Sequence, residues 1–290
     1  MALSPTSVAR RDPARLWPGV ARRALRSLGQ CLPGQCLPGH CLLGLCLLGL
    51  RLLVLRLLVL CLAVTGAGRA VASDTSGIQS ATFLAPTTRY AHAVLGDGVE
   101  YGALRIRLTG EAAPRDVTLP QDHVFEDLAP RLVDLTLDGR ADAVMVVETD
   151  MARGAALALY GPEGKLAETP HIGRTNRWLA PVGAADLDGD GRVEIAYVDR
   201  PHLARTLRIW RYQDGALTQI AAAEGLANHR IGEDFISGGI RTCAGRPEIV
   251  TADARWQRVM ITRLTADGLK VEAEAPFTGP AALLNALSCR

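Results

Sequence analysis

Several residue patterns that would indicate an enzyme are missing from this chain of 290 residues. No serine lies in a Gly-x-Ser-x-Gly frame, which excludes the nucleophile elbow of a hydrolase. No Gly-rich loop that could cradle a phosphate precedes a predicted helix. The histidines show no metal-binding spacing such as His-x-x-x-His, so they are interpreted as loop or surface residues. Those after residue 73 are His92, His123, His171, His202 and His229.

Lysine is also scarce, because Lys165 and Lys270 are the only two in the chain. The formal net charge is +2, but many of the arginines lie before residue 73 and the remainder is acidic. A nucleic-acid-binding protein presents a basic patch to the phosphates. We therefore expect no nucleic-acid partner.

Cysteine is nearly confined to the first part of the chain. Five cysteines lie between residues 31 and 61, and only Cys243 and Cys289 follow. In an exported chain, two remaining cysteines predict one disulfide. Two free buried thiols are the alternative.

The N-terminal segment has the order of a secretory signal. Residues 31–62 are an apolar tract with a five-residue period, which matches neither a helix nor a strand. Arginines between residues 10 and 26 precede it, and Ala70-Val-Ala72 follows it. This order predicts a signal peptide with a Cys/Leu-rich extension over residues 1–72, a mature chain from Ser73, and a periplasmic or extracellular location.

Other interpretations of this segment stay open. Residues 41–64 are long enough to be an uncleaved membrane anchor, although Arg51 and Arg56 weaken that interpretation. Lipid attachment at Cys61 and a translation start further downstream are further alternatives. Contact with a membrane is expected only if the segment is not cleaved.

The stretch from Asp186 to Glu194 has the spacing of a calcium-binding loop. Carboxylates stand at its positions 1, 3, 5 and 9, and a glycine stands at position 6. Calcium takes six to eight oxygen ligands, which alternating short side chains can supply. An EF-hand is excluded, because position 12 is Tyr197 in a strand-like run. An Asp/Gly turn without metal is the remaining alternative.

The loop recurs along the chain. Residues 134–142 repeat it 52 residues upstream, and residues 238–250 repeat its frame with one residue deleted. In that last copy Arg241 and Cys243 replace the first two aspartates, which predicts a loop without metal. Strands are predicted at 143–147, 155–160, 194–198, 206–212, 217–220, 247–250 and 258–262. Four short strands in about 50 residues are typical of a propeller blade.

These loops and strands resemble the FG-GAP/VCBS repeats of integrin α-subunit-like β-propellers, over residues 90–279. The resemblance implies a Ca²⁺ cofactor held between the first two strands of a blade. It implies side-chain ligands from Asp186, Asp188, Asp190 and Glu194 with the Arg192 carbonyl. A weaker second site would use Asp134, Thr136, Asp138 and Asp142 with the Arg140 carbonyl.

Residues 73–290 are too few for seven blades, so we expect an all-β, small propeller of about four, or five, four-stranded blades. Residues 89–95 and 103–108 are predicted as later strands of the first blade. Residues 280–289 would then supply its first strand and close the ring. A Cys243–Cys289 disulfide would staple that closure. An open array that needs a partner is the alternative.

Two further residue groups are interpreted structurally. Trp178, Trp210 and Trp256 recur about once per repeat, which favours packing between blades over sugar stacking. The acidic pairs at 126–127 and 233–234 are interpreted as surface turns, not as a catalytic pair.

The sequence predicts an exported, calcium-stabilised, non-catalytic module that binds a protein or glycan on one face of the ring, as a monomer. A propeller-scaffold hydrolase or lyase of the cell envelope is the alternative, because fold alone does not settle function. A structural envelope component is the third possibility.

Overall fold

The computed structural model describes residues 77–290. The predicted signal peptide, its cleavage before Ser73, the anchor at 41–64 and Cys61 lie outside the described residues. Among the described residues, no helix is both long enough and apolar enough to cross a bilayer.

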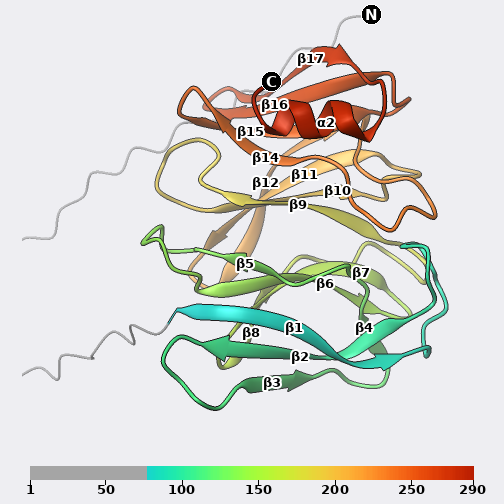
Figure 1. The fold of residues 1–290 in the computed structure, drawn as a ribbon, viewed down its shortest axis with the longest axis vertical. Coiled ribbons are helices and arrows are strands. Elements are labelled where there is room, and N and C mark those ends of the chain that lie inside the picture. The colour runs from blue at the N-terminus through green and yellow to red at the C-terminus, as the bar shows by residue number, and fades with distance from the viewer. Residues whose placement is uncertain (1–76) are drawn as a thin grey trace, which may run out of the picture. The chain divides into compact units, whose positions relative to one another are not determined.

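The described chain is all-β apart from one short helix, and its sheets are antiparallel (Figure 1). Three groups of four consecutive strands follow one another, which we name repeat 1, repeat 2 and repeat 3. Repeat 1 consists of β5 (Arg131–Val133), β6 (Ala143–Asp150), β7 (Gly154–Gly161) and β8 (Gly164–Glu168). Repeat 2 consists of β9 (Leu179–Ala185), β10 (Glu194–Asp199), β11 (Thr206–Gln213) and β12 (Ala216–Glu224). Repeat 3 consists of β14 (Gly239–Cys243), β15 (Arg246–Asp253), β16 (Arg258–Thr265) and β17 (Gly268–Pro276).

All strands that the sequence predicted within the three repeats are confirmed. Within each repeat, consecutive strands pair as neighbours. In repeats 1 and 2 a loop of eight or nine residues joins the first two strands, and a two-residue turn joins the last two. The short strand β13 (Leu226–Ala227) adds to β15 of repeat 3 beside these four.

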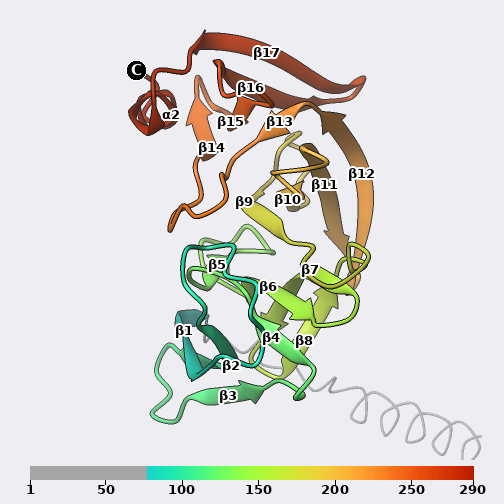
Figure 2. The same cartoon turned by 90° about the vertical axis from the view of Figure 1, so that its right-hand side faces the viewer.

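The sheets stack face to face, so the central strands are apolar on both faces (Figure 2). In β6, Met145 and Val147 enter the core shared with repeat 2, while Val144 and Val146 enter the core on the opposite side. In β10, Ile195 likewise faces repeat 1 and Ala196 faces repeat 3. Successive side chains of a strand point to opposite faces, so an unbroken apolar run fills two cores at once.

The N-terminal strands differ from the predicted blade. They are β1 (Ile78–Thr87), β2 (Glu100–Leu108), β3 (Arg115–Thr118) and β4 (His123–Phe125). β2 pairs with β1, β3 and β4, and β4 continues to β6, so one sheet of eight strands includes repeat 1.

The prediction of a strand at residues 89–95 is wrong, because the chain there forms a loop between β1 and β2. The apolar side chains of Val94 and Leu95 are buried in the core between repeats 1 and 2. The Tyr90 hydroxyl accepts a hydrogen bond from the Asn176 backbone N–H, which fixes the loop to the β8–β9 connection. The other predicted strand, 103–108, is confirmed within β2.

The C-terminal segment does not close a ring. Residues 280–287 form helix α2 (Pro280–Leu287) instead of the predicted strand. Its alanines and leucines favour a helix, and Pro280 begins it where no backbone N–H is needed. Leu283 and Ala286, three residues apart, pack on β15 and β16. Within residues 77–290, no strand pairing joins β1–β3 to repeat 3, and the two groups lie at opposite ends of the array (Figure 1).

Helix α2 therefore covers the outer face of the last sheet, as a terminal cap does in stacked repeats. Cys243 at the end of β14 and Cys289 just after α2 form a disulfide with a Cα–Cα distance of 6.0 Å. The cysteine count predicted this pairing, but the bond attaches the cap to repeat 3 and does not close a ring. The predicted closure is corrected in favour of the open array.

Candidate functional site

The loop before β10 is wound around Asp186. One carboxylate oxygen of Asp186 accepts hydrogen bonds from the backbone N–H groups of Gly189 (2.8 Å) and Asp190 (3.0 Å). The other accepts from Gly191 (2.9 Å). Both glycines have φ near +80° (79° and 83°), in the left-handed region that side chains disfavour. These hydrogen bonds all lie within residues 186–191, so the conformation of the loop rests on local contacts.

Three of the predicted calcium ligands converge. Carboxylate oxygens of Asp186, Asp188 and Glu194 all lie within 4.8 Å of one another. Glu194 begins β10 and is fully buried, and one of its oxygens accepts a hydrogen bond from the Leu187 N–H (2.8 Å). Burial raises the pKa of Glu194, although the guanidinium of Arg211 opposes the rise. A cation beside this carboxylate would offset the cost of burying its charge.

Arg211 already places one positive charge in this cluster. It lies on β11 directly opposite Glu194. Its guanidinium contacts Glu194 (2.6 Å), Asp188 (2.6 Å) and Asp190 (3.0 Å). The carboxylates suit Ca²⁺ in chemistry, since all are hard oxygen donors. Arg211 would have to share or release them when the ion binds.

Asp190 and Arg192, the other two predicted ligands, are arranged differently. One oxygen of Asp190 accepts a hydrogen bond from the Arg192 N–H (3.0 Å), which tightens the turn. Asp190 does not belong to the convergent group among the described residues. Its second oxygen contacts Arg211.

The upstream loop has the same backbone pattern with different side-chain pairing. Asp134 accepts from the N–H groups of Asp138 (3.2 Å) and Gly139 (2.7 Å). One oxygen of Asp142 accepts from the Leu135 and Thr136 N–H groups and from the Thr136 hydroxyl, each at 2.9 Å. The remaining predicted ligands pair with each other, since the Asp138 carboxylate binds the Arg140 guanidinium and N–H. In this loop the carboxylates accept hydrogen bonds from N–H, hydroxyl and guanidinium groups of the loop itself. The described residues show no convergent carboxylate group here.

In repeat 3 Arg241 lies in β14 opposite Glu248, as Ala185 lies opposite Glu194, so the predicted alignment of Arg241 with the first aspartate is wrong by one residue. Arg241 is buried and donates to Glu248 (2.8 Å), Glu274 (2.6 Å) and the Ala286 carbonyl of α2 (2.8 Å). Glu248 corresponds to Glu194 and pairs with Arg263, as Glu194 pairs with Arg211. Burial alone would raise the pKa of Glu248. The hydrogen bonds from Arg241 and Arg263 have the larger effect and hold the pKa below its ordinary value.

A match to a known protein family begins at the Asp134 loop and ends just after the Asp186 loop. Residues 134–197 match the model of the FG-GAP-like repeat. This chain carries an FG-GAP-like repeat. Among curated proteins and among solved structures, none matches the chain.

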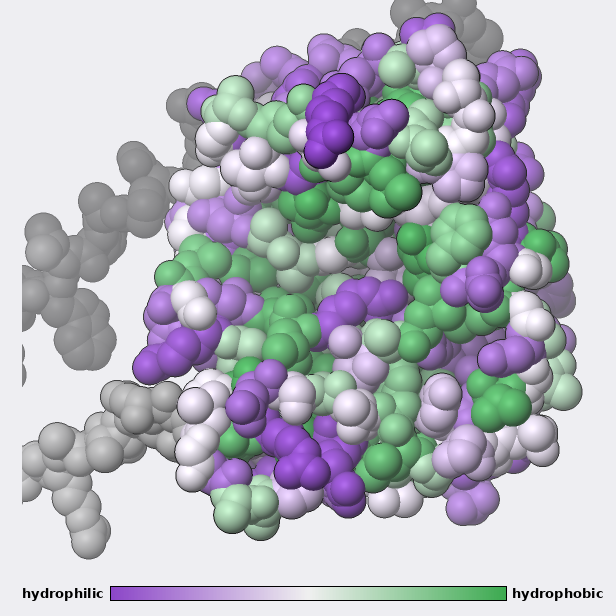
Figure 3. Space-filling model, viewed as in Figure 1, coloured by the Kyte–Doolittle hydropathy of each residue, from purple (hydrophilic) through white to green (hydrophobic). Residues whose placement is uncertain are grey.

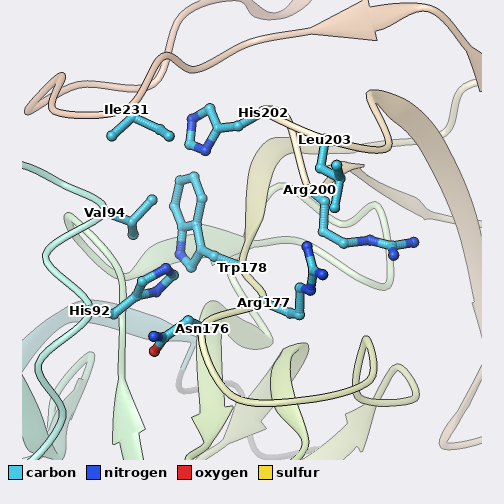
Figure 4. A pocket seen from close by; sticks show the side chains of 9 residues that line it. All are labelled: His92, Val94, Asn176, Arg177, Trp178, Arg200, His202, Leu203 and Ile231. Carbon is cyan, nitrogen blue, oxygen red and sulfur yellow. The ribbon is translucent and has the colours of Figure 1, made fainter.

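Residues 176–178 of the FG-GAP-like repeat line a pocket of about 190 Å³ (Figure 4). Four connections meet there: β1–β2, β8–β9, β10–β11 and β13–β14. Trp178 stands at the centre, with His92 and Val94 on one side and Arg177 and Arg200 on the other (Figure 4). The complete lining is His92, Val94, Asn176, Arg177, Trp178, Arg200, His202, Leu203 and Ile231.

Two contacts fix the orientation of the Trp178 indole. Its Nε1–H donates to the Glu126 carbonyl (2.9 Å), and the ring packs edge-on against His229. Ile231 and Leu203 are 75% and 59% exposed at the rim. The face drawn in Figure 3 carries apolar side chains gathered at the level between β5 and β9.

Buried titratable groups lie beside this pocket. The Glu126 carboxylate is fully buried, contacts His92 Nδ1 (2.5 Å) and accepts from the Thr149 hydroxyl (2.6 Å). The prediction of a surface turn at residues 126–127 is therefore wrong, since Asp127 is buried as well. Asp127 accepts from the Val147 N–H (2.9 Å) and Arg131 (2.7 Å), so both carboxylates satisfy groups inside the fold.

His202 and His229 form a second pair there, with 2.9 Å between His202 Nε2 and His229 Nδ1. Burial and the neighbouring His229 lower the pKa of His202 to about 4. Sequence reasoning missed the pairing of His202 with His229, because no local spacing records it. Arg211 was also missed, although its place opposite Glu194 follows from the hairpin register.

Proposed function

We propose that this chain is an exported, calcium-binding, non-catalytic interaction module that binds a protein or glycan ligand. The observation that carries this proposal is the loop at the end of the FG-GAP-like repeat, where three carboxylates converge within 4.8 Å. Asp186, Asp188 and Glu194 would hold the calcium ion. The bound ion supplies a fixed positive charge that ties the loop to β10, and it stabilises the fold only while bound.

The pocket around Trp178 supports a binding role. Its volume of about 190 Å³ is below the roughly 300–1,000 Å³ usual for small-molecule sites. It therefore suits one inserted side chain or one sugar ring of a larger ligand. An aromatic floor, arginines at one wall and exposed Ile231 at the rim are typical of interface centres.

Export is supported by the Cys243–Cys289 disulfide, because disulfides persist in oxidising compartments and are rare in the cytosol.

Calorimetric titration of Ca²⁺ into the full chain tests the metal site. We expect binding by the wild type and its loss in Asp186→Asn/Asp188→Asn, whereas Asp134→Asn/Asp138→Asn, the matched control loop, keeps it. Unchanged binding in the first double variant would overturn the assignment of the ion to this loop.

Screening the full chain against a glycan array and a displayed peptide library tests the binding face. Ile231→Asp should remove captured ligands, because it places a charge at the pocket rim. Leu284→Asp is the control, since Leu284 is 62% exposed but lies on α2. Equal losses in both variants, or capture that neither variant changes, would contradict a role for the pocket.

One observation favours a second candidate function, a hydrolase or lyase. The His92 imidazole, held by the buried Glu126 carboxylate, has the arrangement of an oriented general base. No serine or cysteine lines the pocket beside it, so water would be the nucleophile. Turnover of any array ligand that His92→Gln abolishes would favour this function over the non-catalytic one.

A further inference from the structure

We propose that His123, Asp150 and His171 form a binding site for a divalent transition-metal ion such as Zn²⁺, separate from the calcium loops. One ring nitrogen of each histidine and one oxygen of Asp150 lie within 4.8 Å of one another. His123 and Asp150 are direct partners in the β4–β6 pairing. His171 follows β8 and contacts the Gly154 carbonyl, and Gly154 pairs with Asp150 across the β6–β7 hairpin.

The second ring nitrogen of each histidine is held, as it is in known metal sites. His171 Nδ1 lies 2.7 Å from the Gly154 carbonyl, so it carries the proton and leaves Nε2 free to bind an ion. His123 Nδ1 lies 2.9 Å from the Asp122 carboxylate, which favours the same tautomer. Metal-binding histidines commonly donate their other N–H to a carbonyl or carboxylate, which orients the ring and raises its basicity.

The freed nitrogen of His123 faces two acidic side chains. Its Nε2 lies 3.8 Å from Asp150 and 4.0 Å from Glu148. Asp150 is buried, and its carboxylate accepts hydrogen bonds from the Ala152 N–H (2.8 Å), the Arg153 N–H (3.0 Å) and the Arg153 guanidinium (2.5 Å), which hold it facing the two histidines.

Arg153 balances the charge of Asp150, with 2.5 Å between them, but its side chain is 61% exposed. It can swing into solvent when an ion arrives. Glu148 is already bound by Tyr160 (2.5 Å) and Lys165 (2.8 Å) through one oxygen, and the other faces His123. The protein thus provides three ligands and leaves a fourth position for water or Glu148, as in open zinc sites.

The donor set selects the class of ion. Two imidazole nitrogens favour zinc, copper, nickel or iron over calcium and magnesium, which take oxygen ligands. In a tetrahedral site with bonds of about 2.0–2.1 Å the ligand atoms stand about 3.4 Å apart. Small rotations of side chains would bring these atoms to that spacing.

Cobalt titration of the full chain tests the site, because Co²⁺ reports tetrahedral coordination by its visible absorption whereas Zn²⁺ is spectroscopically silent. The five cysteines before residue 73 are first alkylated, which leaves the Cys243–Cys289 disulfide intact. We expect one equivalent of Co²⁺ to bind, to be displaced by Zn²⁺, and to remain in excess Ca²⁺.

The variants His123→Gln and His171→Gln should each weaken binding at least about 100-fold, since loss of even an outer-shell partner costs 10–100-fold. The glutamine that replaces His171 retains a side-chain N–H for the Gly154 carbonyl, and circular dichroism reports whether each variant is folded. The control is His202→Gln, which removes a histidine of the other cluster and should bind as the wild type does. The proposal is overturned if the wild type binds no cobalt, or if both site variants bind it as tightly as the wild type.

Discussion

Replacing Arg211 by glutamine should make the fold more dependent on calcium. Arg211 contacts three carboxylates at 2.6–3.0 Å, its side chain is 17% exposed, and its partner Glu194 is fully buried. Without the guanidinium, the cluster keeps its negative charges and loses its internal cation. Removing one partner of a buried ion pair costs about 3–5 kcal/mol. We take the lower end, about 3 kcal/mol, because this cluster is partly exposed.

The magnitude translates into a measurable shift of the melting temperature. For a domain of this size, 1 kcal/mol corresponds to about 2–4 °C. In chelator, Arg211→Gln should therefore melt about 6–12 °C below the wild type. Calcium at 100 times its Kd returns about 2.7 kcal/mol to the variant, which is most of the stability that the substitution removes. The wild type should gain less, because Arg211 competes with the ion for the same carboxylates.

The assay is thermal unfolding of the full chain followed by circular dichroism, with chelator and then with excess Ca²⁺. Arg208→Gln is the matched control, because Arg208 lies on the same strand and binds Asp199 outside the loop. It should show the same calcium-dependent shift as the wild type. The reasoning is refuted if the calcium-dependent shift of Arg211→Gln is no larger than that of the wild type.

Three further predictions concern the rest of the fold. Replacing Cys243 and Cys289 by serine should lower the free energy of unfolding by about 4 kcal/mol, because the bond closes a loop of 46 residues. Chemical denaturation in non-reducing buffer measures this, and a denaturation midpoint equal to that of the wild type would contradict it. Arg241→Met should release α2 and lower the free energy of unfolding by about 3 kcal/mol, since buried Glu248 keeps only Arg263 as a partner. The expected signature is faster hydrogen exchange confined to α2 and β14, and uniformly faster exchange would argue against it. Burial, reinforced by the charge of Glu126, raises the pKa of Glu100 from 4.5 to about 9. The folded state then binds the proton more tightly than the unfolded state, so the free energy of unfolding should fall from pH 4.5 to 9, by about 3 kcal/mol at pH 7. Glu100→Gln should remove that slope in denaturation curves recorded across this range, and a slope that persists would count against the assignment.

Much of the repeat architecture could be predicted because its signals are local. The strands of the three repeats follow from short apolar runs between glycine-rich turns, and the loop at Asp186 closes on its own backbone N–H groups. The convergence of Asp186 with Glu194 follows from a spacing of eight residues along one chain segment.

The terminal segments could not be assigned in the same way. Residues 280–287 were predicted as a strand because ring closure required one, yet Leu283 and Ala286 pack as one face of a helix. Residues 89–95 are apolar like a strand, but they plug a core from a loop. In both segments the apolar residues identify burial, and only the neighbouring surface decides the backbone conformation.

The sequence by itself determined the repeated four-strand units, the loop geometry and the pairing of its two late cysteines, because each depends on spacing along the chain or on a count. Tertiary structure decided that the array stays open, that Arg211 enters the carboxylate cluster, and that His123, Asp150 and His171 meet. These contacts join residues from different strands and connections, so their positions depend on how the sheets pair and stack, which no local pattern records.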